Sequence, residues 1–410
     1  MKKLGKIMSL YLLLALFIGL FACSDRLFTE RKIMSSELTS NVQTREIKVK
    51  DIDITFENIY SEFAVKMMKE LYKEENTCIS PLSIAAAFGM VTNGANGKTK
   101  DELESLLGTD VQTFNSYFAS LMSKNGKSKK LYLANSIWSR KDEVTVKDEF
   151  LDIVKNNYHA QVYSSEFDDN TVKDINNWVY NNTRGGIGNI IEKIEPYEIL
   201  FLINALDFES EWKEKFEKNK IVNKTFHGLQ SEKEVSMMFA TEHTYIESKN
   251  AKGFIKSYAD EDYKFAALLP NEDISIKEYM NSLTGEELNK ILANAQKESI
   301  RIGLPKFDFE NTFDMKPTLK KLGVNEAFEE YGDFTNLGTS KNGIMYIGSV
   351  IHKTHISVDE MKTKASAVTS IGMTNDSAVM LKPIILDKPF VYMILDKNNL
   401  PIFIGAIVNF

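Results

Sequence analysis

The sequence is poor in the residues that small scaffolds and metal sites need. Its 410 residues include two cysteines, eight prolines and five histidines. Two cysteines allow at most one disulfide, so the chain cannot be a disulfide-rich scaffold and must be held together by packing. Cysteine and histidine are also too few and too scattered for a zinc site of ordinary spacing. Because neither a Gly-x-Ser-x-Gly nor a His-Glu-x-x-His motif occurs, we predict no enzyme active site, no metal site and no cofactor.

Positive charge is not in excess either. The 57 acidic residues outnumber the 50 lysines and arginines, which gives a formal net charge of -7. Such a chain repels a phosphate backbone, and it has no basic stripe with interleaved aromatic residues. We therefore expect no nucleic-acid partner. Hydrophobic residues make up 43% of the sequence, which is enough for a large core.

The first residues have the composition of a secretory signal. Three lysines precede an apolar run at 7–21, and the chain then reads Leu20-Phe21-Ala22-Cys23. This step resembles the lipobox of bacterial lipoproteins, so we interpret 1–22 as a signal peptide and Cys23 as the lipid-attachment residue. The expected location is the bacterial cell envelope, at the outer membrane or cell surface, with a periplasmic or secreted protein as the alternatives. A plain cleaved signal and an uncleaved anchor remain open, although the run is shorter than the ~20 residues that span a bilayer.

After the signal, the sequence divides into a short polar segment and one long domain. Residues 23–50 have mixed charge and little apolar periodicity, which predicts a flexible tether. No linker-like stretch interrupts 51–410, so we predict a single large domain there. If Cys23 carries lipid, only Cys78 remains, and its apolar neighbours predict a buried, unreactive thiol.

Helical patterns come early in the domain and strand patterns come late. The sequence predicts an amphipathic helix at 56–72, a deeply buried helix that begins at Ser80-Pro81, and a third helix that opens with a capping box at 99–102. The later elements are predicted strands at 130–138, 200–208, 265–269, 300–309 and 345–358, a helix at 172–183, and a closing hairpin of 390–395 with 402–408. This order indicates an α+β fold with large antiparallel or mixed sheets.

The stretch 361–380 does not read as ordinary structure. It contains no aromatic residue and no leucine, and loops of this length inside a compact domain are usually functional or disordered. If it is read as an extended strand, small apolar side chains fall on one face and polar ones, such as Lys362, on the other. The loop is therefore able to become a strand of a sheet.

These features resemble the serpin family of protease inhibitors over residues 54–410. Glu360 followed by Thr363, Ala365, Ala367 and Thr369 looks like the proximal hinge of the family's reactive-centre loop. Other matches, in chain order, are at 76–84, 94–99, 204–205 with Phe208, Trp212 and Phe216, 304–307, 322–323, 333–334, 387–390 and 403–405. The resemblance implies several helices around three β-sheets, with an exposed, insertable loop at about 360–381.

The resemblance also implies a mechanism. A serine or cysteine protease attacks the loop and forms a covalent acyl-enzyme, and the cleaved loop then inserts into the main sheet and traps the enzyme. Counting the family's usual distance from Glu360 places the reactive bond at Asp376–Ser377, although Met373, Asn375 or Met380 stays open as the recognised residue. The loop neighbours of the bond are Met373, Thr374, Asn375 and Ala378. No lysine or arginine lies between residues 365 and 381, which disfavours trypsin-like targets.

In serpins the region where the sheet opens contains buried polar residues. The matching positions here are Ser80, Ser83, Asn204 and His352 under the middle of the sheet, with Trp212 and Glu360 at its top. We interpret them as structural groups whose partners change on opening, not as acid–base catalysts. Lys362 stands where inhibitory serpins usually have glycine, which leaves a non-inhibitory serpin, acting as a binding or carrier protein, as the alternative. In either case a monomer is expected.

Overall fold

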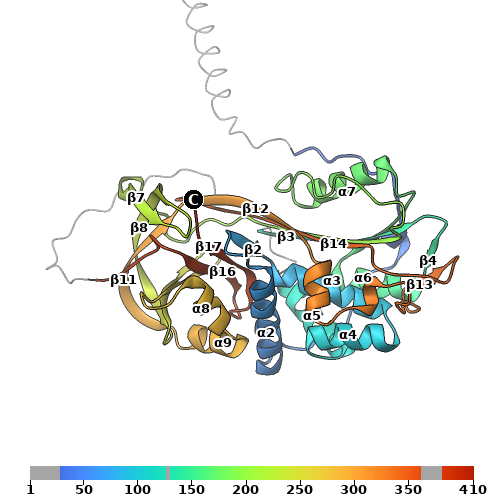
Figure 1. Cartoon of the computed structure of the whole chain (residues 1–410), viewed down its shortest axis with the longest axis horizontal. Coiled ribbons are helices and arrows are strands. Elements are labelled where there is room, and N and C mark those ends of the chain that lie inside the picture. The colour runs from blue at the N-terminus through green and yellow to red at the C-terminus, as the bar shows by residue number, and fades with distance from the viewer. Residues whose placement is uncertain (1–27, 126–129, 362–380) are drawn as a thin grey trace, which may run out of the picture.

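The computed structural model describes residues 28–125, 130–361 and 381–410, which form β-sheets with helices packed around them (Figure 1). The helices are α2 (Ile54–Leu71), α3 (Pro81–Gly94), α4 (Gly97–Leu107), α5 (Val111–Asn125), α6 (Asp148–Tyr158), α7 (Asp169–Asn182), α8 (Ile276–Ser282), α9 (Gly285–Ala293) and α10 (Lys316–Lys321), with short 3-10 turns η1 (Leu38–Asn41), η2 (Lys218–Lys220) and η3 (Glu326–Phe328). The strands are β1 (Ser36–Glu37), β2 (Thr77–Ile79), β3 (Leu131–Arg140), β4 (Val144–Val146), β5 (Gln161–Ser165), β6 (Leu200–Phe208), β7 (Ile221–His227), β8 (Glu232–Glu247), β9 (Ala251–Ser257), β10 (Tyr263–Pro270), β11 (Gln296–Pro305), β12 (Phe307–Asp314), β13 (Gly338–Ser340), β14 (Ser349–Val358), β15 (Lys382–Ile385), β16 (Phe390–Asp396) and β17 (Pro401–Ile407).

The six-stranded sheet has the strand order β1-β5-β3-β6-β14-β12. Its pairs β3–β5 and β6–β14 are parallel, and the other pairs are antiparallel. The helix α7 covers one face, whereas α3, α5 and α6 lie on the opposite side (Figure 1). Trp138, Trp178 and Ile203 pack between the sheet and α7, and Leu202 and Leu206 belong to the larger core on the other side. Burial on both faces explains why β6 is apolar along most of its length.

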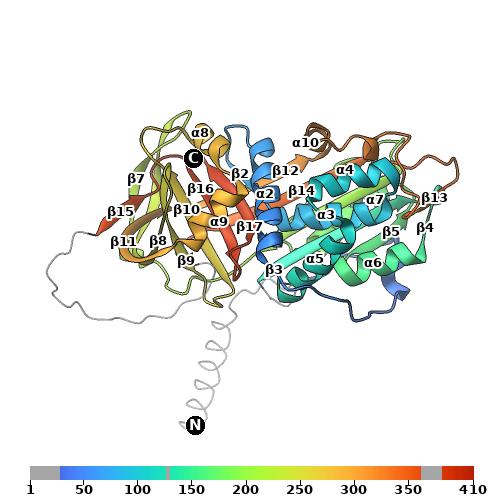
Figure 2. The same cartoon turned by 90° about the horizontal axis from the view of Figure 1, so that it is seen from below.

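The nine-stranded sheet forms the other half of the molecule. Its order is β15-β11-β8-β9-β10-β16-β17-β2, with β7 beside β8. Every residue of β16 and β17 is buried, and α8 and α9 lie against this half, with α2 between the two halves (Figure 2). A third, two-stranded sheet joins β4 and β13. The predicted α+β class is confirmed.

Most predicted elements are confirmed, and α3 shows why. The Ser80 hydroxyl accepts a hydrogen bond from the Ser83 N–H at 3.1 Å, and Pro81 occupies the first turn, where no intrahelical N–H partner is needed. All residues of α3 are buried, as its apolar composition predicts. In β2, Cys78 is fully buried, and burial raises the pKa of its thiol to about 12. The prediction of an unreactive thiol agrees with this environment.

The predicted capping box at 99–102 is wrong. The helix α4 begins at Gly97 with Asn96 as its N-cap residue, so both capping candidates lie inside the helix. Thr99 Oγ1 accepts the N–H of residue 333 at 2.9 Å, and Glu102 Oε2 accepts the N–H of residue 325 at 2.7 Å. These side chains bind distant backbone groups, which a local sequence motif does not reveal.

The single strand predicted at 300–309 is also wrong. The chain breaks at Lys306 into β11, which joins the nine-stranded sheet, and β12, which joins the six-stranded sheet. Apolar alternation continues through the break because both strands bury one face. The periodicity alone therefore cannot show that the chain changes sheets.

The flexible tether predicted at 23–50 is wrong for residues 28–50, which pack on the domain and are called the N-terminal strap below. Within it, β1 pairs with β5 and adds an edge strand to the six-stranded sheet. The carboxylate of Asp174 on α7 accepts hydrogen bonds from the N–H and the hydroxyl of Ser35, both at 2.7 Å. Residues 23–27 lie outside the described part of the chain.

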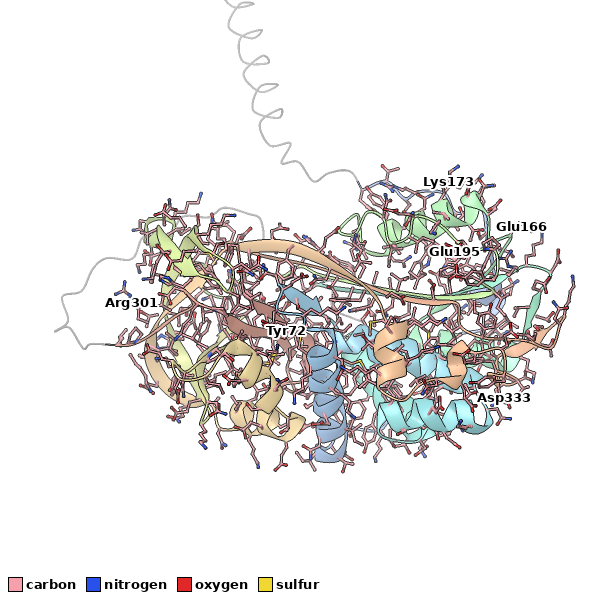
Figure 3. All side chains as sticks on the ribbon, viewed as in Figure 1. Tyr72, Glu166, Lys173, Glu195, Arg301 and Asp333 are labelled. Carbon is pink, nitrogen blue, oxygen red and sulfur yellow. The ribbon has the colours of Figure 1, made fainter. Side chains whose placement is uncertain are left out.

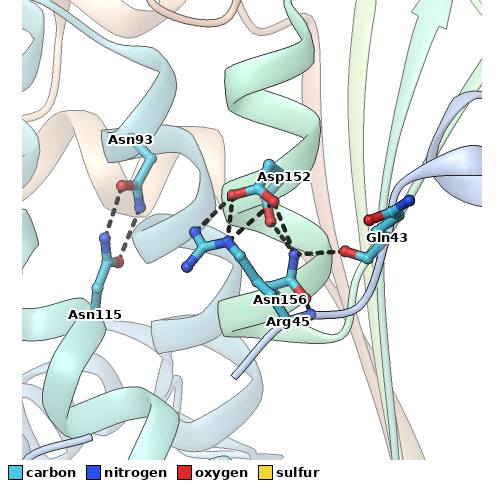
Figure 4. Close-up of polar contacts among 6 residues, drawn as sticks. All are labelled: Gln43, Arg45, Asn93, Asn115, Asp152 and Asn156. Carbon is cyan, nitrogen blue, oxygen red and sulfur yellow. Dashed lines mark hydrogen bonds and ion pairs between the residues drawn. The ribbon is translucent and has the colours of Figure 1, made fainter. Parts of the chain in front are cut away.

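The far end of the N-terminal strap is bound to α6 (Figure 4). The Arg45 guanidinium donates Nη2–H to Asp152 Oδ2 at 2.6 Å and Nε–H to the same oxygen at 2.9 Å. Asn156 accepts the Arg45 N–H at 2.9 Å and donates to the Gln43 carbonyl at 3.3 Å. A polar segment without apolar periodicity is ordered here because distant helices supply hydrogen-bond partners for its backbone.

Candidate functional site: the opening between β6 and β14

The ladder between β6 and β14 stops before either strand ends. Its last pair is Thr354↔Leu206, whereas β6 continues to Phe208 and β14 to Val358. Above that pair each strand keeps its outer neighbour, because β3 still pairs with β6 and β12 still pairs with β14. The two central strands therefore part at one end of the sheet, and a small cavity lined by residues of both strands lies there. We call this place the opening.

Below the opening, Asn204 on β6 links three strands to the start of α3. Its Nδ2 donates to the Ser83 carbonyl at 2.7 Å and to Asn135 Oδ1 on β3 at 2.5 Å, and its Oδ1 accepts the Ser83 hydroxyl. The Ser80 N–H donates to His352 Nε2 at 3.1 Å, and His352 Nδ1 lies 3.0 Å from Asn204 Oδ1. The structure thus brings together the four predicted residues and adds Asn135. A lone amide in an apolar strand was the available signal for Asn135, as it was for Asn204.

The histidine of this cluster is held neutral. His352 is 1% exposed, and burial lowers the pKa of its imidazole to about 3. Because Nε2 accepts the Ser80 N–H, the ring proton sits on Nδ1, where it is donated to Asn204. The ring therefore has one tautomer and two satisfied nitrogens. It is suited to hold strands together and not to exchange protons.

Above the opening, aromatic residues hold the chain that leaves β14. Trp212 donates its indole N–H to the Asp359 carbonyl at 2.7 Å and stacks on Tyr258 with ring centroids 4.6 Å apart. The Phe216 N–H donates to the Glu360 carbonyl at 3.1 Å. Trp212 and Phe216 are both buried. The predicted residues Trp212 and Glu360 therefore lie at the same end of the sheet.

An ion pair fixes the Glu360 side chain. Its carboxylate contacts the ammonium of Lys306, the residue between β11 and β12. The hydrogen bond from Lys306 holds the pKa of Glu360 below its usual range. The next residue, Met361, donates its N–H to Asp359 Oδ1 at 2.8 Å. The last described residues before the loop are thus anchored by backbone and side-chain contacts.

A buried lysine behind these aromatic residues was missed by the sequence analysis. Lys256 on β9 is 2% exposed, and its Nζ lies 2.5 Å from Glu242 Oε1 on β8. The same ammonium lies 4.7 Å from the ring centroid of Phe216. Burial raises the pKa of Glu242, although the Lys256 charge opposes that shift. A lysine within an apolar strand was the only signal, and its partner cannot be named from sequence.

Other predicted residues lie outside the described part of the chain. They are Cys23, Lys362, the hinge residues Thr363, Ala365, Ala367 and Thr369, and the reactive-bond region Met373, Thr374, Asn375, Asp376, Ser377, Ala378 and Met380. On the far side of that segment, β15 pairs in parallel with β11 at the edge of the nine-stranded sheet. Within 28–125, 130–361 and 381–410, no helix is long and apolar enough to cross a bilayer. Over the same ranges, no three metal-binding side chains lie close enough together to hold an ion.

Solved structures with this architecture include a thermophilic serpin and a thyroxine-binding globulin. The native state of the thermophilic serpin tengpin superimposes with a TM-score of 0.88 at 38% identity, covering 92% of this chain and 100% of that one. Human thyroxine-binding globulin in complex with its ligand superimposes with a TM-score of 0.78 at 25% identity, covering 87% and 98%. Side chains fill the space between the sheets and helices, and Lys173 on α7 points away from the six-stranded sheet (Figure 3).

Sequence comparison also finds serpins among the relatives of this chain. A serpin-like protein of Thermococcus kodakarensis is 30% identical over 367 residues, which cover 86% of this chain and 85% of that protein. Human serpin B8 is 28% identical over 84% of this chain and 96% of its own length. The family model described as "Serpin (serine protease inhibitor)" matches residues 58–410. The chain therefore belongs to the serpin family.

Proposed function

We propose that this serpin is a suicide-substrate inhibitor of serine or cysteine endopeptidases. The observation that carries the proposal is the opening: β6 and β14 part above Thr354↔Leu206, and Glu360, from which the loop departs, is anchored at that end. A strand that enters there would lie between the edges of β6 and β14, which no ladder joins above that pair. Each inserted residue would gain ladder hydrogen bonds and bury a small side chain. Insertion of the reactive loop into the main sheet is an established form of strand addition in serpins.

The chemistry is that of an interrupted peptide cleavage. The protease nucleophile attacks the loop carbonyl, the peptide bond breaks, and the new amine leaves with a proton while the carbonyl stays bonded to the enzyme. The freed loop inserts before water can attack that ester or thioester. The inserting strand must part β6 from β14 below the opening, and it must break the His352–Asn204 contact.

The reactive bond that we propose is Asp376–Ser377. An aspartate at this position favours caspase-like, granzyme-like or other acid-specific enzymes. Recognition at Met373 or Met380 would instead favour elastase-like, chymotrypsin-like or papain-like enzymes. The absence of lysine and arginine between 365 and 381 argues against trypsin-like targets, whose specificity pocket needs a cation.

The test is to incubate residues 24–410 with a panel of serine and cysteine proteases. We expect a complex that survives denaturing electrophoresis, with a released fragment that begins at Ser377 in mass spectrometry. A fragment with another first residue would correct the reactive bond. Cleavage without any complex across the panel would refute inhibition.

A binding or carrier serpin is the second candidate, and the complex of thyroxine-binding globulin shows that the fold can hold a small ligand. The two candidates differ in what cleavage does. If the loop inserts, the cleaved protein gains a strand, and its midpoint of thermal unfolding should rise sharply. If cleavage leaves the midpoint unchanged, the sheet does not take up the loop and the carrier role is favoured.

We further propose that the protein acts as a monomer anchored to the bacterial envelope through lipid on Cys23. The support is the Leu20-Phe21-Ala22-Cys23 step. The native protein should partition into detergent and sediment with membranes, whereas Cys23→Ser should not. Equal behaviour of the two proteins would contradict lipidation at this residue.

A further inference from the structure

A row of charged side chains crosses the opening on the α7 side of the sheet. His355 on β14 is the first residue above the last β6–β14 pair. Its Nε2 lies 3.1 Å from Asp308 Oδ1 on β12, and its Nδ1 lies 3.8 Å from Asp207 Oδ1 on β6. The imidazole is therefore the one described side chain that reaches both neighbouring carboxylates at this level. The Asp207–His355 contact spans the two strands that part.

Charged groups on β12 and β14 also lie near His355. On β12, Glu310 is its direct cross-strand partner, but the Glu310 carboxylate binds the Lys353 ammonium at 2.9 Å. Lys353 also donates to the Asn189 carbonyl at 3.0 Å. Since Lys353 neutralises Glu310, Asp207 and Asp308 are left to face the imidazole.

The Asp207 carboxylate, on the other side of His355, is also enclosed by neighbouring residues. Its cross-strand neighbour on β3 is Tyr132, and the Arg184 guanidinium lies 4.7 Å from the centroid of that ring. A Cβ atom on Gly186, in the segment after α7, would lie 2.7 Å from Asp207 Oδ2, so this segment packs directly on the carboxylate. Tyr258 lines the small cavity at the opening together with His355. Asp207 is thus confined beside His355 and is not free to swing into solvent.

We propose that His355 is a positioning residue for loop insertion: its imidazolium, held between Asp207 and Asp308, ties β6, β14 and β12 together at the level where the inserting strand enters. This inference rests on the proposed trapping function. The inserting strand must move Asp207 away from His355, so the contact opposes insertion when the ring is charged. When the ring is neutral, the charge attraction is lost and the strands part more readily.

The sign of the pH effect follows from the geometry. The contact with the Asp207 carboxylate is the largest of the interactions that raise the pKa of His355 above 6.5, and the hydrogen bond with Asp308 adds to it. A raised pKa means that the stabilisation of the closed strands is complete below pH 6.5 and is lost as the pH rises through the folded-state pKa. Insertion should therefore be slower at pH 6 than at pH 8. His352 contributes nothing to this change, because its pKa of about 3 keeps it neutral at both values.

The experiment follows strand entry without a protease. A fluorescently labelled peptide with the sequence of residues 363–376 is added to residues 24–410, and its uptake into the intact protein is timed from pH 5.5 to pH 8.5. We expect uptake about threefold to fivefold faster at pH 8 than at pH 6, the range for one partly exposed ion pair. His355→Gln and Asp207→Asn should both give a flat profile near the fast limit. His355→Lys, which keeps the charge, should stay slow at every pH.

A matched control separates this effect from general titration. His227 is an exposed histidine on β7, in the other sheet, with Nδ1 2.8 Å from Glu232. His227→Gln should keep the pH profile of the native protein. The inference is overturned if native uptake does not change with pH, or if His355→Gln changes with pH as the native protein does. If native uptake is pH-dependent but no protease complex forms, only the trapping function fails, whereas peptide that never enters the sheet refutes both.

Discussion

The two histidines of β14 lie three residues apart and have opposite environments. Because side chains alternate along a strand, His352 points toward α3 and His355 toward the α7 side. His352 is buried among amides and hydroxyls, and its pKa falls to about 3. His355 is partly exposed beside two carboxylates, and its pKa rises. The paired part of the β6–β14 junction is thus held by a neutral network that does not respond to pH, and the open part by charges that do.

The largest effect is expected beside the open part, from Lys256→Met on β9, behind the aromatic residues that hold the chain leaving β14. The change leaves the Glu242 carboxylate buried without its cation, which should lower the free energy of unfolding by about 3 kcal/mol. Urea denaturation at pH 7 measures it. Lys252→Met on the same strand is the control, with a change within about 0.5 kcal/mol expected. A loss of similar size in both variants would contradict a special role for the buried pair.

The next effect is expected in the paired part, from Asn204→Ala. The change deprives the Ser83 hydroxyl and Asn135 of their partner and leaves His352 Nδ1–H without an acceptor. We expect a loss of about 2 kcal/mol, the middle of the range of about 1 to 3 kcal/mol for removing one partner from a buried hydrogen-bonded cluster. The midpoint of urea unfolding should fall equally at pH 6 and pH 8. Asn223→Ala, on the exposed face of β7, should leave it unchanged.

A smaller, pH-dependent effect is expected for Glu360→Gln. The pKa of Glu360 is lowered by Lys306, so its contribution is present above pH 4.5 and is lost as the pH falls through the folded-state pKa. The pair is partly exposed, and about 0.5 kcal/mol is expected at pH 7. Thermal unfolding from pH 3 to pH 7 should show the two proteins converging at low pH. Glu286→Gln, in the exposed pair with Lys290 on α9, should give no measurable change.

The smallest expected effect is the change in protonation of the two histidine rings as the pH is varied in the native protein. In proton–carbon NMR spectra, the His352 ring should keep neutral-form shifts from pH 5 to pH 8, whereas the His355 ring should titrate with a midpoint above 6.5. His355→Gln assigns the moving signal by removing it. A His352 signal that moves in this range would break the comparison, because it would mean that the buried cluster is open to water.

Short sequence motifs correctly predicted the elements that are stabilised by interactions within a few residues. Ser80-Pro81 predicted the start of α3 because the cap and the proline act within one turn. The capping box at 99–102 was wrong because its side chains bind backbone groups from 325 and 333. The prediction of one strand at 300–309 was wrong because distant strands again decide the outcome. The residues before Lys306 pair with β8 and those after it pair with β14, and the periodicity of the sequence does not show this change of partner.

The order of residues along the chain was enough to identify the family, the buried α3, and the polar residues Asn204 and His352 of the strand junction, because these depend on short motifs and on residue types out of place in apolar strands. Long-range packing was needed for the order of the N-terminal strap, the Lys256–Glu242 pair, and the position of His355 between Asp207 and Asp308. Those features join residues far apart in the chain, and their energies depend on distance and desolvation, which exist only once the strands are side by side.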